Sequence, residues 1–110
     1  MGLFSTIGNS VFFIRSAQKI NDYQKQIAFL ANKNQYATVI PQHDKMQILG
    51  YAQQIEDVAI EMRNKLNSLS PQEQFSIMVP CLDGHSTAVP GFVMASMAMV
   101  EALRTDLKNM

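Results

Sequence analysis

The chain has 110 residues, of which 47% are hydrophobic and 16% are charged, and its formal net charge is zero. A chain of this length can bury a hydrophobic core without metals or disulfides, and this composition excludes a disordered protein. Residues 1–40 carry four cations against Asp22 alone, a net charge of +3. These cations are too dispersed to form the basic stripe of a nucleic-acid-binding protein. We therefore expect one globular domain over residues 1–110 and no nucleic-acid partner.

The first residues, MGLFST, fit the pattern M-G-x-x-x-[ST] for myristoylation of Gly2. The apolar stretch from Leu3 to Ile14 has no Lys or Arg before it, unlike a signal peptide. It is also too short and too often interrupted by polar residues to span a bilayer. We expect residues 1–8 to form a buried arm in a cytoplasmic protein. A peripheral membrane protein docked by this segment is the alternative.

A first helix is predicted over residues 9–32, because apolar and small positions recur at helical spacing. They are Phe13, Ser16, Ile20, Tyr23, Ile27 and Leu30, at intervals of 3, 4, 3, 4 and 3. The run Val11-Phe12-Phe13-Ile14 places four large apolar residues within about one turn. One helix face uses only two or three of them, so we expect Phe12 and Phe13 to meet another element or another chain.

A second helix is predicted over residues 44–69, where seven residues follow one another at intervals of 4, 3, 4, 3, 4 and 3. They are Ile48, Ala52, Ile55, Ala59, Met62, Leu66 and Leu69. Asp44 is a suitable N-cap. Gly50 is unfavourable in a helix interior and indicates a close backbone contact. The connection over residues 33–43 is short, so the two helices should form an antiparallel hairpin.

Two further helices are predicted. The first covers residues 71–79, because Ser70-Pro71-Gln72-Glu73 has the form of a capping box, and Pro80 should end it. The second covers residues 90–108, and its FVMASMAMV segment is apolar nearly all round, so we expect it to be buried on more than one side. No strand is predicted. Small residues spaced 4, 3 and 4 in the last helix would let a neighbouring backbone approach closely: Gly91, Ala95, Ala98 and Ala102.

The segment PCLDGHSTAVPG contains the only cysteine, Cys81, and one of the two histidines, His85. A nucleophilic cysteine needs a lowered pKa and a base that a third group orients, and no such group stands at a recognisable spacing. A structural zinc site needs four ligands, and only His43 could join this segment from elsewhere. We expect a structural loop, with no metal and no cofactor. A small enzyme that uses Cys81 and His85 is the alternative.

The fold expected is all-α: a long antiparallel helical hairpin, a short helix and a buried C-terminal helix, arranged like a four-helix bundle. This amount of apolar helix surface exceeds what one small core needs, and methionine is common at adaptable binding surfaces. We expect a non-enzymatic protein–protein interaction module, such as an adaptor, a chaperone-like or inhibitor (immunity-type) protein, or a subunit of a larger assembly. Its partner would be another protein or a second copy of the chain. The candidate partner-binding residues are Phe12, Phe13, Tyr51, Met94, Met97 and Met99.

Overall fold

A computed structural model of the chain describes residues 3–109. The elements in chain order are α1 (Leu3–Lys33), α2 (Gln42–Leu66), α3 (Pro71–Ser76), β1 (Met78–Pro80), β2 (Ser86–Ala88) and α4 (Val89–Lys108). The regular structure of the described residues is therefore helical except for one small two-stranded sheet, and the all-α prediction is confirmed.

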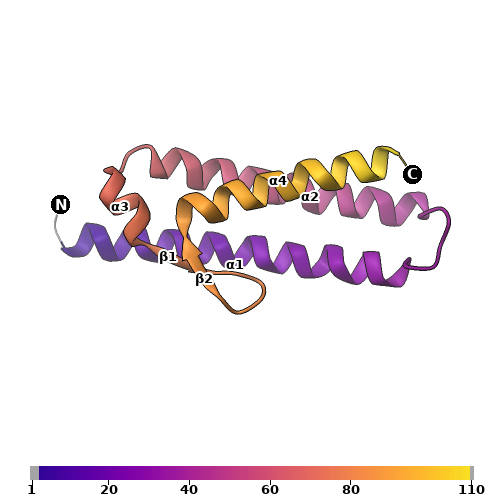
Figure 1. Cartoon of the computed structure of the whole chain (residues 1–110), viewed down its shortest axis with the longest axis horizontal. Helices are drawn as coiled ribbons and strands as arrows, with labels where there is room; N and C mark the ends of the chain where they lie inside the picture. Colours follow the sequence, from indigo (N-terminus) through magenta and orange to yellow (C-terminus); the bar gives the residue numbers. More distant parts are fainter. Residues whose placement is uncertain (1–2, 110) are drawn as a thin grey trace.

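The helices lie lengthwise in an elongated molecule of 54 × 22 × 17 Å. α1 and α2 form the predicted antiparallel hairpin, and α4 runs back beside α2 (Figure 1). α2 packs extensively against both other long helices, whereas α1 and α4 make little direct contact with each other. The β1–β2 hairpin lies against α1, and its loop projects from the side of the bundle (Figure 1).

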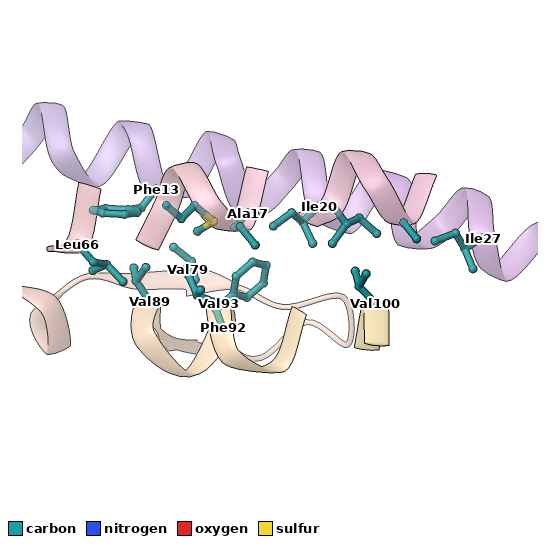
Figure 2. Close-up of a cluster of buried hydrophobic side chains, with 14 of the residues drawn as sticks. Phe13, Ala17, Ile20, Ile27, Leu66, Val79, Val89, Phe92, Val93 and Val100 are labelled. Atoms are coloured by element: carbon teal, nitrogen blue, oxygen red, sulfur yellow. The ribbon is translucent and has the colours of Figure 1, made fainter. Parts of the chain in front are cut away.

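The helical spacing of apolar residues predicted the core correctly. All seven positions of the 44–69 pattern are buried. In α1 the predicted face is also buried, except that Tyr23 is half-buried. Figure 2 shows side chains of α1, including Phe13 and Ile20, facing β1 and α4, where Val79 and Phe92 meet them. Hydrophobic burial along this seam holds the three long helices and the hairpin together.

The N-terminal boundary predicted for the first helix is wrong. α1 begins at Leu3, so residues 3–8 belong to the helix instead of forming an arm. The second helix also begins earlier than predicted, at Gln42, with Pro41 at the N-cap position, and it ends earlier, at Leu66, so that Leu69 lies in the turn that follows it. Asp44 therefore lies inside the first turn and does not cap the helix. Pro41 ends the connection with a fixed backbone angle, and the helix starts directly after it.

The helix predicted over residues 71–79 is too long. The capping box is present: Ser70 Oγ accepts from the Glu73 backbone N–H, and Glu73 accepts from the Ser70 backbone N–H. The helix nevertheless ends at Ser76, and Met78–Pro80 pairs with Ser86–Ala88 in an antiparallel hairpin that the sequence analysis did not predict. An extended backbone points alternate side chains to one side, so Ile77 and Val79 both enter the core while Met78 stays outside.

The C-terminal helix is buried on one face only, contrary to the expectation from its composition. Its buried residues are Val89, Phe92, Val93, Ser96, Val100 and Leu107. α1, α2, α3 and the hairpin all contact α4. The opposite side of α4, which carries Met94, Ala95 and Ala98, is exposed in the described chain. The apolar residues on that opposite side remain in contact with solvent.

Candidate functional site

The loop between β1 and β2 is closed by its own backbone. The Cys81 N–H donates to the His85 carbonyl at 2.7 Å, and the Gly84 N–H donates to the Cys81 carbonyl at 3.1 Å. Gly84 has a φ of 92°, a left-handed conformation that glycine adopts without strain. The Asp83 carboxylate accepts from the His85 N–H at 2.9 Å. Asp83 and Gly84 thus act as turn residues that reverse the chain.

The chemistry of this loop does not match that of an activated cysteine. Burial, together with the nearby Asp83 carboxylate, raises the pKa of the Cys81 thiol, whereas a nucleophile needs a lowered pKa. The exposed His85 ring points its Nδ1 to Asp83 Oδ2 at 3.2 Å. No hydrogen bond joins the Cys81 thiol to the His85 ring among the described side chains. The structure therefore brings Asp83 and His85 together, but not Cys81 and His85 as base and nucleophile.

Residues 3–109 contain no group of three or more His, Cys, Asp or Glu side chains placed to hold a metal ion. His43 lies exposed in the first turn of α2, in a different element from the loop that carries Cys81 and His85. The Asp83 carboxylate is held ionised by its own loop, because the hydrogen bond from the His85 backbone N–H lowers the pKa of Asp83.

The six candidate partner-binding residues lie in different surroundings. Phe13 is fully buried in the core, and Phe12 is half-buried with its ring edge against Phe13, at a centroid distance of 5.2 Å. Tyr51 is half-buried on α2 and packs on Tyr23 of α1, at 6.0 Å. The structure does not bring these aromatic residues together with the methionines of α4.

Among the three candidate methionines, only Met94 is freely accessible. Met97 and Met99 are half-buried against the core, and Arg63 of α2 lies over the Met97 sulfur at 3.9 Å. Met94 is 74% exposed. It lies on the side of α4 that faces away from the bundle, together with the small residues of the predicted stripe. We call this uncharged surface the outer face of α4: Gly91, Met94, Ala95, Ala98 and Ala102.

A groove beside the outer face separates α4 from α1. It has a volume of about 450 Å³. Its lining comes from α1, from the loop of the hairpin and from the first turns of α4. We call it the Asn21 groove, and its lining residues are Asn21, Gln24, Cys81, Leu82, Asp83, Thr87, Gly91, Phe92, Ala95 and Ser96.

Sequence reasoning did not find the Asn21 groove. Asn21 stands in the polar run Asn21-Asp22-Tyr23-Gln24, which is typical of a solvated helix face. It is buried because the hairpin folds over it, and its Nδ2 donates to the carbonyl of Pro80 at 2.9 Å. The two residues are 59 positions apart, so no local pattern could have predicted the contact.

Comparisons with known protein families, with curated proteins and with solved structures gave no match to this chain. Among residues 3–109, no helix combines the length and the apolar character that crossing a bilayer requires. Gly2, which an acyl group would modify, lies outside the described residues. The membrane-docking alternative therefore stays a prediction.

Proposed function

We propose that this protein is a non-enzymatic protein–protein interaction module, that the outer face of α4 is its contact surface, and that a second copy of the chain is the partner. One observation carries the proposal: Met94 is 74% exposed on a side of α4 that Gly91, Ala95, Ala98 and Ala102 extend, and the opposite side of this helix is anchored in the core. An exposed apolar surface of this kind is typical of interaction sites. We also propose a cytoplasmic location, since a single cysteine cannot build the disulfide framework that is common in small secreted domains.

Self-pairing is supported by the order of residues along the outer face. In an antiparallel pair of α4 helices centred on Ala98, Met94 of each copy lies opposite Ala102 of the other. A large flexible side chain then packs over a small one at both ends of the contact, as a two-fold symmetric interface requires. Small residues at such a contact let two helices approach to about 8 Å.

The charges next to the outer face also permit this pairing. Glu101 is exposed on α4, and the antiparallel arrangement places it opposite Ala95, so that like charges do not meet. Arg104 points to the other side, where it forms an ion pair with Glu56 of α2 and donates to Gln53 at 3.0 Å. A single helix pair about 30 Å long is a small interface. We therefore expect a weak dimer, with a Kd in the micromolar range or above.

Sedimentation velocity over about 10 μM to about 1 mM, where weak dimers form, tests this proposal. The sedimentation coefficient should rise with concentration for the unchanged chain. Ala98→Glu places an unpaired charge at the centre of the contact and should weaken the dimer about tenfold or more. Ala28→Glu makes the same change at an exposed position of α1 and is the matched control.

Circular dichroism should show that both variants keep the helical content and melting temperature of the unchanged protein within a few degrees, because both positions are exposed. A chain that stays monomeric over the whole concentration range would contradict the proposal. Equal effects of Ala98→Glu and Ala28→Glu would also contradict it, since the contact would then lie elsewhere.

A further inference from the structure

The exposed side of α1 changes from apolar to cationic along the helix. The first charged residue of α1 is Arg15, and its first acidic residue is Asp22. Ile7 is 50% exposed and Val11 is 41% exposed. Arg15 and Lys19 are also exposed and continue the same spacing of four residues, which places successive side chains next to one another on a helix surface. We call this row the α1 ridge: Ile7, Val11, Arg15 and Lys19.

The two cations of the α1 ridge are not neutralised within the described part of the chain. The ion pairs found among residues 3–109 involve neither Arg15 nor Lys19. Both residues line a groove between α1 and α2, in which Glu61 of α2 is the one carboxylate among the lining residues. The lining therefore keeps an excess of positive charge beside the exposed apolar residues.

Charge is divided unevenly over the molecule, and α1 carries most of the positive part. Residues 1–40 have a net charge of +3, and the remaining residues have a net charge of −3. Figure 1 shows that α1 forms one long side of the molecule and that its first turns lie at one end, beyond α2 and α4. Near an anionic surface, the molecule would therefore turn α1 towards that surface.

A lipid surface fits the α1 ridge better than a soluble anion does. Either one attracts the cations, but only a lipid surface also offers Ile7 and Val11 an apolar environment. The uncharged first turns of α1 can enter the headgroup region without burying a charge. Arg15 and Lys19 stand about 6 Å and about 12 Å further along the helix than Val11, so their long side chains can reach lipid phosphates from there.

We propose that the α1 ridge docks this protein on an anionic lipid surface. Ile7 and Val11 enter the interface between the headgroups, and Arg15 and Lys19 contact lipid phosphates. The ridge lies on α1, apart from the proposed dimer contact on α4, and its use depends neither on dimerisation nor on an acyl group at Gly2.

Co-sedimentation of the full, unacylated chain with lipid vesicles tests the proposal, at about 1 μM protein, where the weak dimer is dissociated. Phosphatidylcholine vesicles with about 30% phosphatidylserine should bind the chain at least about tenfold more tightly than vesicles of phosphatidylcholine alone. Raising the salt from about 0.1 M to about 0.5 M should weaken this binding, because salt screens exposed charges. Poly-L-glutamate offers carboxylates without an apolar phase and should bind about tenfold more weakly than the mixed vesicles.

Two matched pairs of variants separate the α1 ridge from general effects of charge and apolar surface. Lys19→Gln should weaken vesicle binding about fivefold, whereas Lys108→Gln, at the opposite end of the molecule, should leave it unchanged. Val11→Ser should weaken binding about threefold, whereas Val39→Ser, in the connection between α1 and α2, should have no effect. All four positions are exposed, so circular dichroism should show an unchanged fold in every variant.

The proposal is overturned if the mixed vesicles do not bind the chain or bind it no better than phosphatidylcholine alone. It is also overturned if Lys19→Gln and Lys108→Gln act alike, because overall charge would then be responsible. Poly-L-glutamate binding as tight as that of the vesicles would indicate an acidic polypeptide as the partner instead. Ala98→Glu should bind the vesicles like the unchanged chain, so the dimer proposal and this one can fail separately.

Discussion

Asp44 shows how a single buried carboxylate can join two helices. Its Oδ2 accepts from Asn34 Nδ2 at 3.0 Å and lies 3.4 Å from Lys33 Nζ. Asn34 also donates to the carbonyl of Leu30, so one amide connects the last turn of α1 to the first turn of α2. The sequence indicated a role for Asp44 at a helix start, but not this partner. The connection that brings Asn34 back to Asp44 is an irregular loop with no periodic pattern.

The pH dependence of stability should report the Asp44 contact. The hydrogen bond from Asn34 lowers the pKa of Asp44 below its ordinary value of 3.8, and Lys33 acts in the same direction. A carboxylate whose pKa is lower in the folded chain stabilises it fully above the unfolded pKa. This stabilisation is lost as the pH falls through 3.8 and then through the lower folded value. Asp44→Asn should therefore be less stable than the unchanged protein at pH 7, and the difference should shrink towards pH 3 and below.

Urea unfolding at both pH values, followed by circular dichroism, measures this difference. Asp22→Asn, at an exposed position of α1, is the control for a general effect of charge. If the free energies of unfolding of Asp44→Asn and of the unchanged protein differed by the same amount at every pH, the ionised carboxylate would contribute nothing to stability.

At the scale of the elements, Gly50 of α2 is a residue whose neighbours the sequence did not predict correctly. A glycine in a helix interior indicated a close backbone contact. In the structure Gly50 is exposed, and a Cβ built at this position meets no heavy atom within 4 Å. The predicted contact is wrong for the described chain, and α2 carries the entropic penalty of glycine without an intramolecular reason.

Gly50→Ala should therefore raise the free energy of unfolding by about 0.5–1 kcal/mol, because alanine has less backbone freedom to lose. Gly84→Ala is the matched comparison. It makes the same change at a φ of 92° and should destabilise the hairpin, since alanine is strained in that conformation. Thermal and urea unfolding of both variants measure the two effects. If Gly50→Ala destabilised the chain instead, a neighbour that the structure does not show would have to approach α2 there.

The long helices could be predicted from the sequence, because each one buries a regular face over several turns, as Ile55 and Met62 do in α2. The β-hairpin could not. Each of its strands has three residues, too few to show an alternating pattern, and β1 contains Pro80, which lacks a backbone donor. Asp83-Gly84 is a sequence common in turns, but it carries no information about the strands on either side of it. The capping box at Ser70 marked the start of α3 but carries no information about its end.

At the scale of the whole molecule, the elongated shape of the chain explains why some apolar side chains remain exposed to solvent. A compact domain of this length has a radius of gyration of about 13 Å, whereas the Cα atoms of this chain give 15.7 Å. An elongated layer of three helices has more surface for its volume than a sphere, so it encloses fewer residues. Within the described part of the chain, Phe29, Phe75 and Met94 are all largely exposed. The sequence predicted this excess of apolar surface, although five of the six residues named for it, all except Met94, are buried in the core or packed against it.

The proposed dimer has a shape that small-angle X-ray scattering can recognise. The first turns of α4 share the Asn21 groove with the middle of α1, so Ala98 lies closer to the middle of the molecule than to either end. A two-fold axis through Ala98 then places the two copies side by side. The maximum dimension should exceed the 54 Å of one copy only moderately and stay well below twice that length. Ala98→Glu should return the scattering to that of a single chain at the same concentration. A dimer about twice as long as the monomer would require contact through the ends of the bundle and would contradict pairing through α4.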